Sequence, residues 1–484
     1  MLWAWGCRGG GRPLGGRRSG GLPVQCWAWP VLVCIFVASP AAARPKRPPP
    51  VAVEARFKQR ITAKLQASLS LASEHLAWTL GVQETAAARS GMAGNPGTFG
   101  KYELELAGEG AWRRSCETDI DAERDSVTLC ALHKLQALTA LCEVEGMAVA
   151  HRAGVMALLR QLLGRRGRVV PGLGVKRALL PVATGLEAWL VEKAPGSGEY
   201  DIQVAVQAAA MLAIVRCGSA LGEREVFSDV QAWFVAAEKA YPRSAWDRLS
   251  FHSNSILLES FVLISTTVHH GSAFAEEIRE FIAAFESYLQ TAFSRDPKLW
   301  SFSGAHAAVL SWAAEKKRAR RKQLGRTVDE YVRRWRAMAP GLNVSWTYTC
   351  GPLQGLAPLL LKQGSDAAEL VGSVLRLAEK DVDLFQLHGR GANRSAAAGR
   401  LDAGVLEAWP ALEGAFLRDE EQLRREQRWS LRIDDTAQCA LGLARTLRVL
   451  EGLRGLDVPE VADHGAEAGS SPGSLQATGA HAEL

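Results

Sequence analysis

Two adjacent acids near the C-terminal end of the chain are the residues best placed to do chemistry. Asp434 and Asp435 precede an apolar run whose spacing predicts a helix over 435–453. A carboxyl group at a helix start can exchange a proton with a ligand, and it can equally cap the free N–H groups of the first turn. Both are candidate catalytic residues; we expect one to cap the helix and Asp434 to be the working acid.

Aromatic and polar side chains cluster before another predicted helix, over 351–362. Trp346 and Tyr348 lie in the preceding loop, and Gln354 lies in the first turn. Aromatic faces stack on sugar rings or hold cations, and an amide can orient a hydroxyl-rich ligand. The alternative is that Trp346 only packs against the incoming helix. We take all three as candidate ligand-binding residues.

A histidine and a glutamate lie seven residues apart, at His252 and Glu259. This spacing is two helical turns, so both side chains would share one face of a helix that contains both. Such a pair could bind a ligand and do acid–base work. In the alternative, Glu259 caps a neighbouring element or faces solvent.

The element Asp434-Asp435-Thr436-Ala437 resembles the DxDD-Thr-Ala element of class II terpenoid cyclases, whose middle aspartate protonates the substrate. The resemblance covers about six residues and departs at the first acid, where this chain has Arg432. It implies an (α/α) toroid, a fold whose enzymes place such acids at the starts of inner helices. Asp434 matches the middle aspartate.

Several classes of site have no motif in this sequence. It lacks the metalloprotease, nucleophile-elbow, Walker and Rossmann signatures, and its cysteines have no metal-finger spacing. We expect no metal and no cofactor. The strongest charge feature is the basic run over 316–322, with Arg333, Arg334 and Arg336 beyond it. Behind a signal peptide it favours an anionic glycan, a membrane surface or a processing site; the alternative is a solvated helix face.

The first 43 residues have the order of a signal peptide. A basic, glycine-rich stretch precedes the apolar run 27–37 and the small residues Ala41-Ala42-Ala43, and 44–50 is a proline-rich spacer. We expect a secretory or extracellular protein without a stable membrane span after cleavage; a signal anchor or an organelle leader is the alternative. The formal charge of +6 falls by four with the leader, so we expect no nucleic-acid partner.

Two glycosylation sequons, at Asn343 and Asn393, are compatible with this route. Six cysteines lie in the body: Cys116, Cys130, Cys142, Cys217, Cys350 and Cys439. They allow up to three disulfides, in fifteen pairings, or they remain as free, buried thiols.

The body, 51–454, predicts an all-α fold. Helical spacing occurs over 51–82, 120–144, 147–163, 175–192, 201–221, 224–240, 253–269, 273–293, 304–323, 328–338, 351–362, 366–380, 401–418 and 435–453. A capping box, Thr327 with Glu330, marks the start of 328–338. We expect stacked helical hairpins, closed into an (α/α) toroid rather than an open solenoid, and a disordered tail over 455–484.

These features favour a secretory toroid that binds or processes a carbohydrate, because many helical toroids of that compartment handle glycans. The first alternative is a non-catalytic helical interaction protein, in which the acids cap helices and the tryptophans pack in the core. The second is a terpenoid-cyclase-like enzyme. The sequence does not indicate an oligomeric state.

Overall fold

The computed structural model describes residues 50–82, 101–105, 112–115, 127–164, 198–223, 234, 243–247, 249–267, 272–296, 299–338, 350–363, 368–388, 395–400, 412–418, 420–425 and 428–454. The expected signal peptide and C-terminal tail lie outside the described residues. So do Trp346, Tyr348 and both sequon asparagines, Asn343 and Asn393.

Most of the described residues are helical, which confirms the all-α prediction. The helices are α1 (Pro50–Thr79), α3 (Val127–Glu143), α4 (Met147–Ala150), α5 (Arg152–Gly164), α7 (Gly198–Leu221), α9 (Arg243–Trp246), α10 (Phe251–Thr267), α11 (Ser272–Arg295), α12 (Phe302–Ala314), α13 (Arg318–Met338), α14 (Gly351–Gln363), α15 (Ala368–Phe385), α17 (Glu420–Arg424) and α18 (Ile433–Arg454). Leucine, alanine and arginine have high helix propensity, so local preference and tertiary packing agree over most of the chain.

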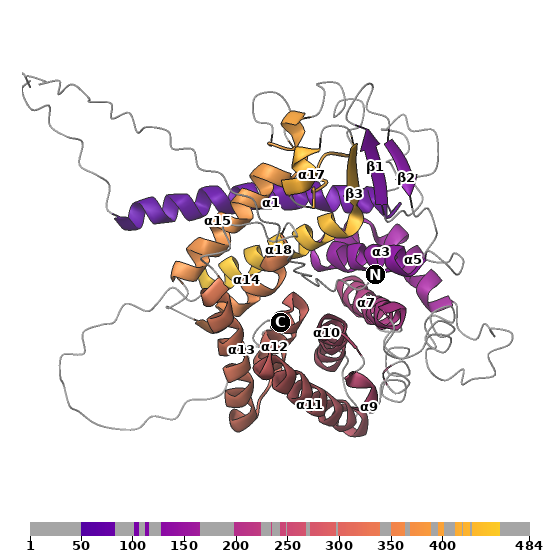
Figure 1. The fold of residues 1–484 in the computed structure, drawn as a ribbon, viewed down its shortest axis with the longest axis vertical. Coiled ribbons are helices and arrows are strands. Elements are labelled where there is room, and N and C mark those ends of the chain that lie inside the picture. Colours follow the sequence, from indigo (N-terminus) through magenta and orange to yellow (C-terminus); the bar gives the residue numbers. More distant parts are fainter. Residues whose placement is uncertain are drawn as a thin grey trace, which may run out of the picture.

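Six of these helices, which we call the central helices, contact one another in cyclic order. Along the cycle α18 packs on α3, α3 on α7, α7 on α10, α10 on α12, α12 on α14, and α14 on α18 (Figure 1). Further helices cover them from outside: α1 packs on α18, α11 on α10, α13 on α12 and α14, and α15 on α14. Outer and central helices alternate along the sequence, as in stacked hairpins.

Close helix packing keeps the core of this arrangement dense. A Cβ atom at Gly442 of α18 would lie 2.7 Å from Cβ of Leu353 on α14, so the glycine permits these helices to approach. Among the described residues, one stretch, 204–221 in α7, is long and apolar enough by composition to cross a membrane. It belongs to a central helix and is mostly buried against its neighbours.

A small antiparallel sheet, not expected from the sequence, lies beside the first turn of α18 (Figure 1). Its strand order is β2 (Trp112–Ser115), β1 (Lys101–Glu105), β3 (Arg428–Arg432), with Tyr102 opposite Leu431 in the register. In β3, Trp429 and Leu431 are buried while Arg428 is exposed. This alternation over five residues is the signal that the sequence carried for a strand.

Some of the predicted helix boundaries are wrong. The predicted helix over 304–323 is interrupted at Glu315, whose extended backbone ends α12, and its side chain accepts from the N–H of Lys317 at 2.7 Å. The helix then continues unbroken as α13, so Thr327 and Glu330 form no capping box. Glu330 instead accepts hydrogen bonds from Arg333 and Arg334 on the same helix, a spacing that favours a helix interior.

The predicted helix over 401–418 also fails at its C-terminal end. Residues 412–418 form turns and a β-bridge between Phe416 and Gln386. Gly414 adopts a φ of 95°, a conformation that terminates helices. Residues 401–411 lie outside the described part.

Candidate functional site

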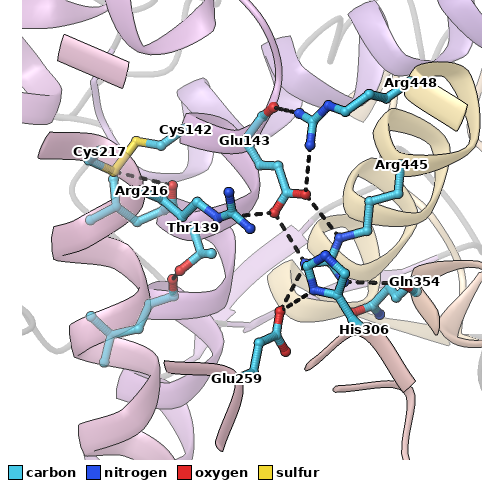
Figure 2. A network of polar contacts seen from close by, with 12 residues as sticks. Thr139, Cys142, Glu143, Arg216, Cys217, Glu259, His306, Gln354, Arg445 and Arg448 are labelled. Atoms are coloured by element: carbon cyan, nitrogen blue, oxygen red, sulfur yellow. Dashed lines mark hydrogen bonds and ion pairs between the residues drawn. A yellow bond between two sulfur atoms is a disulfide. The ribbon is translucent and has the colours of Figure 1, made fainter. Parts of the chain in front are cut away.

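A buried network of charged side chains lies where the central helices meet, and each of the six helices contributes one group (Figure 2). In chain order the groups are Glu143 (α3), Arg216 (α7), Glu259 (α10), His306 (α12), the main-chain carbonyl of Gln354 (α14) and Arg445 (α18). We call these residues the central network.

Arg445 joins four of these helices. Its guanidinium group binds both carboxylate oxygens of Glu143, at 2.9 and 3.1 Å, and donates to Oε1 of Glu259 at 3.1 Å. A further N–H group donates to the carbonyl of Gln354 at 3.1 Å. Arginine suits this position because its planar donors reach several acceptors at once and keep their charge when buried.

Glu143 is surrounded by three arginines. Besides Arg445, it lies 3.6 Å from Nε of Arg216 and 3.5 Å from a guanidinium nitrogen of Arg448, which also donates to its main-chain carbonyl. Burial acts to raise the pKa of Glu143, but Arg445 and Arg216 outweigh it and hold this pKa well below its usual value. Arg448 differs from the other arginines, because its side chain is 57% exposed.

His306 and Glu259 form a buried pair. Nδ1 of His306 lies 2.6 Å from Oε1 of Glu259, and both side chains are about 6% exposed. Burial, together with the charge of Arg445, lowers the pKa of His306. Burial acts to raise the pKa of Glu259, but its interactions with His306 and Arg445 reverse the effect and lower it. At neutral pH the pair is therefore a carboxylate and a neutral imidazole.

This protonation state fixes the roles of the two ring nitrogens. A carboxylate only accepts hydrogen bonds, so Nδ1 of His306 carries the proton and donates it to Glu259. The other nitrogen, Nε2, has its lone pair available and no hydrogen-bond partner among the described residues. A neutral histidine oriented by a carboxylate can act as a general base, and then as a general acid once it is protonated.

The structure brings together two of the residues singled out in the sequence, Glu259 and Gln354, although Gln354 participates through its main chain. His252 lies apart from them: it is exposed in the first turn of α10, whereas Glu259 is buried in the middle of that helix. Four members of the network were not among the residues predicted from the sequence: His306, Arg445, Glu143 and Arg216. The available signal was a lone charged or titratable residue inside an otherwise apolar helix, such as His306 in α12.

Asp434 belongs to a separate buried cluster at the start of α18. Arg432 binds both of its carboxylate oxygens, and Nε2 of His133 lies 3.6 Å from Oδ2 of Asp434. Burial acts to raise the pKa of Asp434, but the charges of His133 and Arg432 lower it, so Asp434 is ionised. It lies eleven residues from Arg445, which is about 16 Å along the helix axis.

The neighbouring acid, Asp435, is also buried in the first turn of α18. The helix begins at Ile433, so Asp434 and Asp435 are its second and third residues rather than the residue before it. Acids in this position favour the helix dipole. The next residue, Thr436, accepts a hydrogen bond from the main chain of Phe416 at 3.1 Å, which ties the 412–418 segment to the helix.

Two disulfides join central helices. Cys142 of α3 pairs with Cys217 of α7, and Cys350, beside the start of α14, pairs with Cys439 of α18. Cys116 and the side chain of Cys130 lie outside the described part. Disulfides persist in oxidising compartments, so these pairs are consistent with a secretory route.

Asp381 of α15 contacts the main chain of Cys350, a member of the second disulfide. Its carboxylate accepts from the main-chain N–H of Cys350 at 3.0 Å, and burial raises its pKa to about 7.

Within the described part of the chain, no group of three His, Cys, Asp or Glu side chains could hold a metal ion. The comparisons with protein-family models, with curated proteins and with solved structures find no match to this chain.

Proposed function

We propose that the protein is a secretory (α/α) toroid that binds or processes a carbohydrate at the central network. The cyclic contacts of the six central helices support a closed toroid over an open solenoid, in which the first and last helices would not touch. The two disulfides and the predicted leader support the secretory compartment.

One observation carries the proposal: Glu259 binds Nδ1 of His306 where the six central helices meet, and Nε2 of His306 has no hydrogen-bond partner among the described residues. In this site Nε2 of His306 accepts a proton from a ligand hydroxyl or returns one, and Glu259 stabilises the imidazolium that forms. Arg216 and Arg448, which contact Glu143 of the same network, orient ligand oxygens. The carbohydrate class follows from the association of helical toroids with glycans.

The test is a glycan-binding and glycan-turnover screen of the mature protein, repeated on His306→Gln and Glu259→Gln. We expect His306→Gln to lower turnover by about 10²–10⁴-fold, as is typical when a general acid–base residue is removed. His252→Gln, at an exposed position on α10, is the matched control and should keep the parent activity. A parent protein that neither binds nor turns over any glycan would contradict the proposal.

The alternative is a non-catalytic interaction protein, favoured by the charge balance of the central network. The charges of Arg216 and Arg445 compensate those of Glu143 and Glu259. Holding the helices together is therefore a sufficient role for the network. In that case His306→Gln changes stability and leaves ligand binding unaltered. The cyclase-like reading has less support, since an acid that protonates a substrate must carry a proton and Asp434 is ionised. An isoprenoid-cyclisation assay of the parent and of Asp434→Asn tests this directly.

A further inference from the structure

Five exposed cations lie along one face of the outer helix α13. They are Arg318, Lys322, Arg326, Arg333 and Arg336, and we call them the α13 stripe. At 100° per residue these positions fall within an arc of about 80°, and at 1.5 Å per residue the stripe is about 27 Å long. The same arc contains one acid, Asp329, which pairs with Lys362 of α14.

The charges of the stripe are largely uncompensated. Arg333 forms an ion pair with Glu330, but no carboxylate among the described residues pairs with Arg318, Lys322, Arg326 or Arg336. The first turn of α13 also contains no acid. Cations at this end of a helix oppose the helix dipole, and like charges one turn apart repel. Folding therefore gains little from Arg318, Lys322 and Arg326, whereas Arg336 in the last turn favours the helix dipole. The N-terminal half of the stripe is the part that indicates a binding role.

The stripe begins next to a cleft of about 600 Å³ between α10, α11 and the α12–α13 junction. Lys316 and Lys317 line this cleft, and their ammonium groups have no carboxylate partner among the described residues. Of the three acids in the lining, Glu286 and Glu315 are paired with Arg320, and Glu280 is accompanied by Arg279. The hydroxyl-bearing residues Ser265 and Thr266 lie on the α10 side. The cleft thus extends the cationic surface past the start of α13.

We propose that the α13 stripe and the adjoining cleft form a docking surface for a linear sulfated polysaccharide. A straight row of cations matches a linear polyanion. A membrane fits less well, because the only exposed large apolar side chains among the described residues are Val149 and Leu361, neither of them on α13. Anionic lipids also concentrate on the cytoplasmic leaflet, and the disulfides indicate the opposite compartment.

The experiment measures the affinity of the mature full chain for heparin over a series of NaCl concentrations. In the test variant Arg318, Lys322 and Arg326 are all replaced by Gln; in the control variant Arg160, Arg424 and Arg428, exposed on α5, α17 and β3, are replaced by Gln. We expect the test variant to bind at least tenfold more weakly. The slope of log affinity against log salt should decrease in magnitude by about two to three, because three fewer cations displace counterions from the polyanion.

Thermal melting of both variants checks that these exposed substitutions leave the fold intact. A charge-retaining variant, Arg318→Lys with Arg326→Lys, should keep most of the parent affinity. Equal losses in the test and control variants overturn the proposal. It is also overturned if the parent binds desulfated heparin as tightly as heparin, or if it prefers phosphatidylserine vesicles or RNA. Because the stripe lies outside the central network, none of these outcomes bears on His306.

Discussion

Arg445 holds together two carboxylates that belong to different helices, and it is 4% exposed. Removing a charge from water is costly, and a buried ion pair recovers that cost only when its remaining donors and acceptors are also satisfied. Arg445 meets this condition through Glu143, Glu259 and the carbonyl of Gln354. The arrangement makes the network sensitive to loss of a single member.

Arg445→Ala should lower the free energy of unfolding by about 3–5 kcal/mol, because it leaves Glu143 and Glu259 buried without their common partner. Urea unfolding of the purified protein measures this. Arg448→Ala is the control: this side chain also contacts Glu143 but is 57% exposed, so its loss should cost less than about 1 kcal/mol. Similar effects of the two substitutions would show that the buried contacts of Arg445 do not stabilise the fold.

Asp381 gives the stability of the protein a pH dependence. Burial raises the pKa of this carboxyl from 3.8 to about 7, so the folded chain binds a proton more tightly than the unfolded chain does. Stability from this group is therefore greatest below pH 4 and declines as the pH rises from about 4 to about 7.

Asp381→Asn should be more stable than the parent at pH 8, and the difference should shrink as the pH is lowered towards 4. Asparagine keeps an oxygen that accepts from the N–H of Cys350 but never acquires the buried charge. Thermal melts at several pH values measure this. The control is Asp383→Asn, on the same helix, whose side chain is 49% exposed. The prediction is contradicted if the difference in stability between the parent and Asp381→Asn is the same at pH 5 and at pH 8.

At the scale of the elements, one disulfide lies next to the central network in sequence and in space. Cys142 precedes Glu143 at the end of α3, and Cys217 follows Arg216 on α7. The disulfide thus fixes the two helices at the point where Nε of Arg216 lies 3.6 Å from the carboxylate of Glu143. It closes a chain segment of 75 residues, which restricts the unfolded chain.

Replacing both Cys142 and Cys217 by serine should lower the free energy of unfolding by about 2–4 kcal/mol, the usual range for a native disulfide. If the link also positions the site, glycan turnover should fall in the folded variant as well. Chemical unfolding and the glycan screen measure the two effects separately. A parent protein that binds two equivalents of a thiol reagent at these residues would show that the disulfide does not form.

At the scale of the whole molecule, the compartment decides whether the disulfides and the α13 stripe can serve the proposed roles. Sulfated polysaccharides occur along the secretory route, and disulfides persist in its oxidising compartments. Both proposals therefore depend on the N-terminal leader, which the sequence predicts.

Cleavage after Ala43 is the corresponding prediction. Small residues follow an apolar run of signal-peptide length, so the secreted chain should begin at Arg44. N-terminal sequencing of protein from the culture medium of expressing cells tests this. Glycopeptide mass spectrometry of the same material shows whether Asn343, beside the Trp346 loop, is less occupied than Asn393. A cytosolic chain that still begins at Met1 would contradict the secretory assignment and the use of the stripe proposed above.

The sequence by itself determined the helical class and most helix positions. Apolar spacing in α1, α10 and α18 is a local property, and the helices formed close to the predicted bounds because local propensity and burial agree there. The break at Glu315 and the turn at 412–418 were missed because capping hydrogen bonds and a positive φ at Gly414 leave little trace in periodicity.

Only the tertiary structure decided which charged residues meet. Glu143 and Arg445 are 302 residues apart, and neither belongs to a motif. Glu259 was found from its spacing to His252, yet its partner proved to be His306, 47 residues away on the next central helix. A spacing pattern ranks residues along one helix, whereas a buried charge is compensated by whichever neighbouring helix supplies its partner, and helix packing alone determines that.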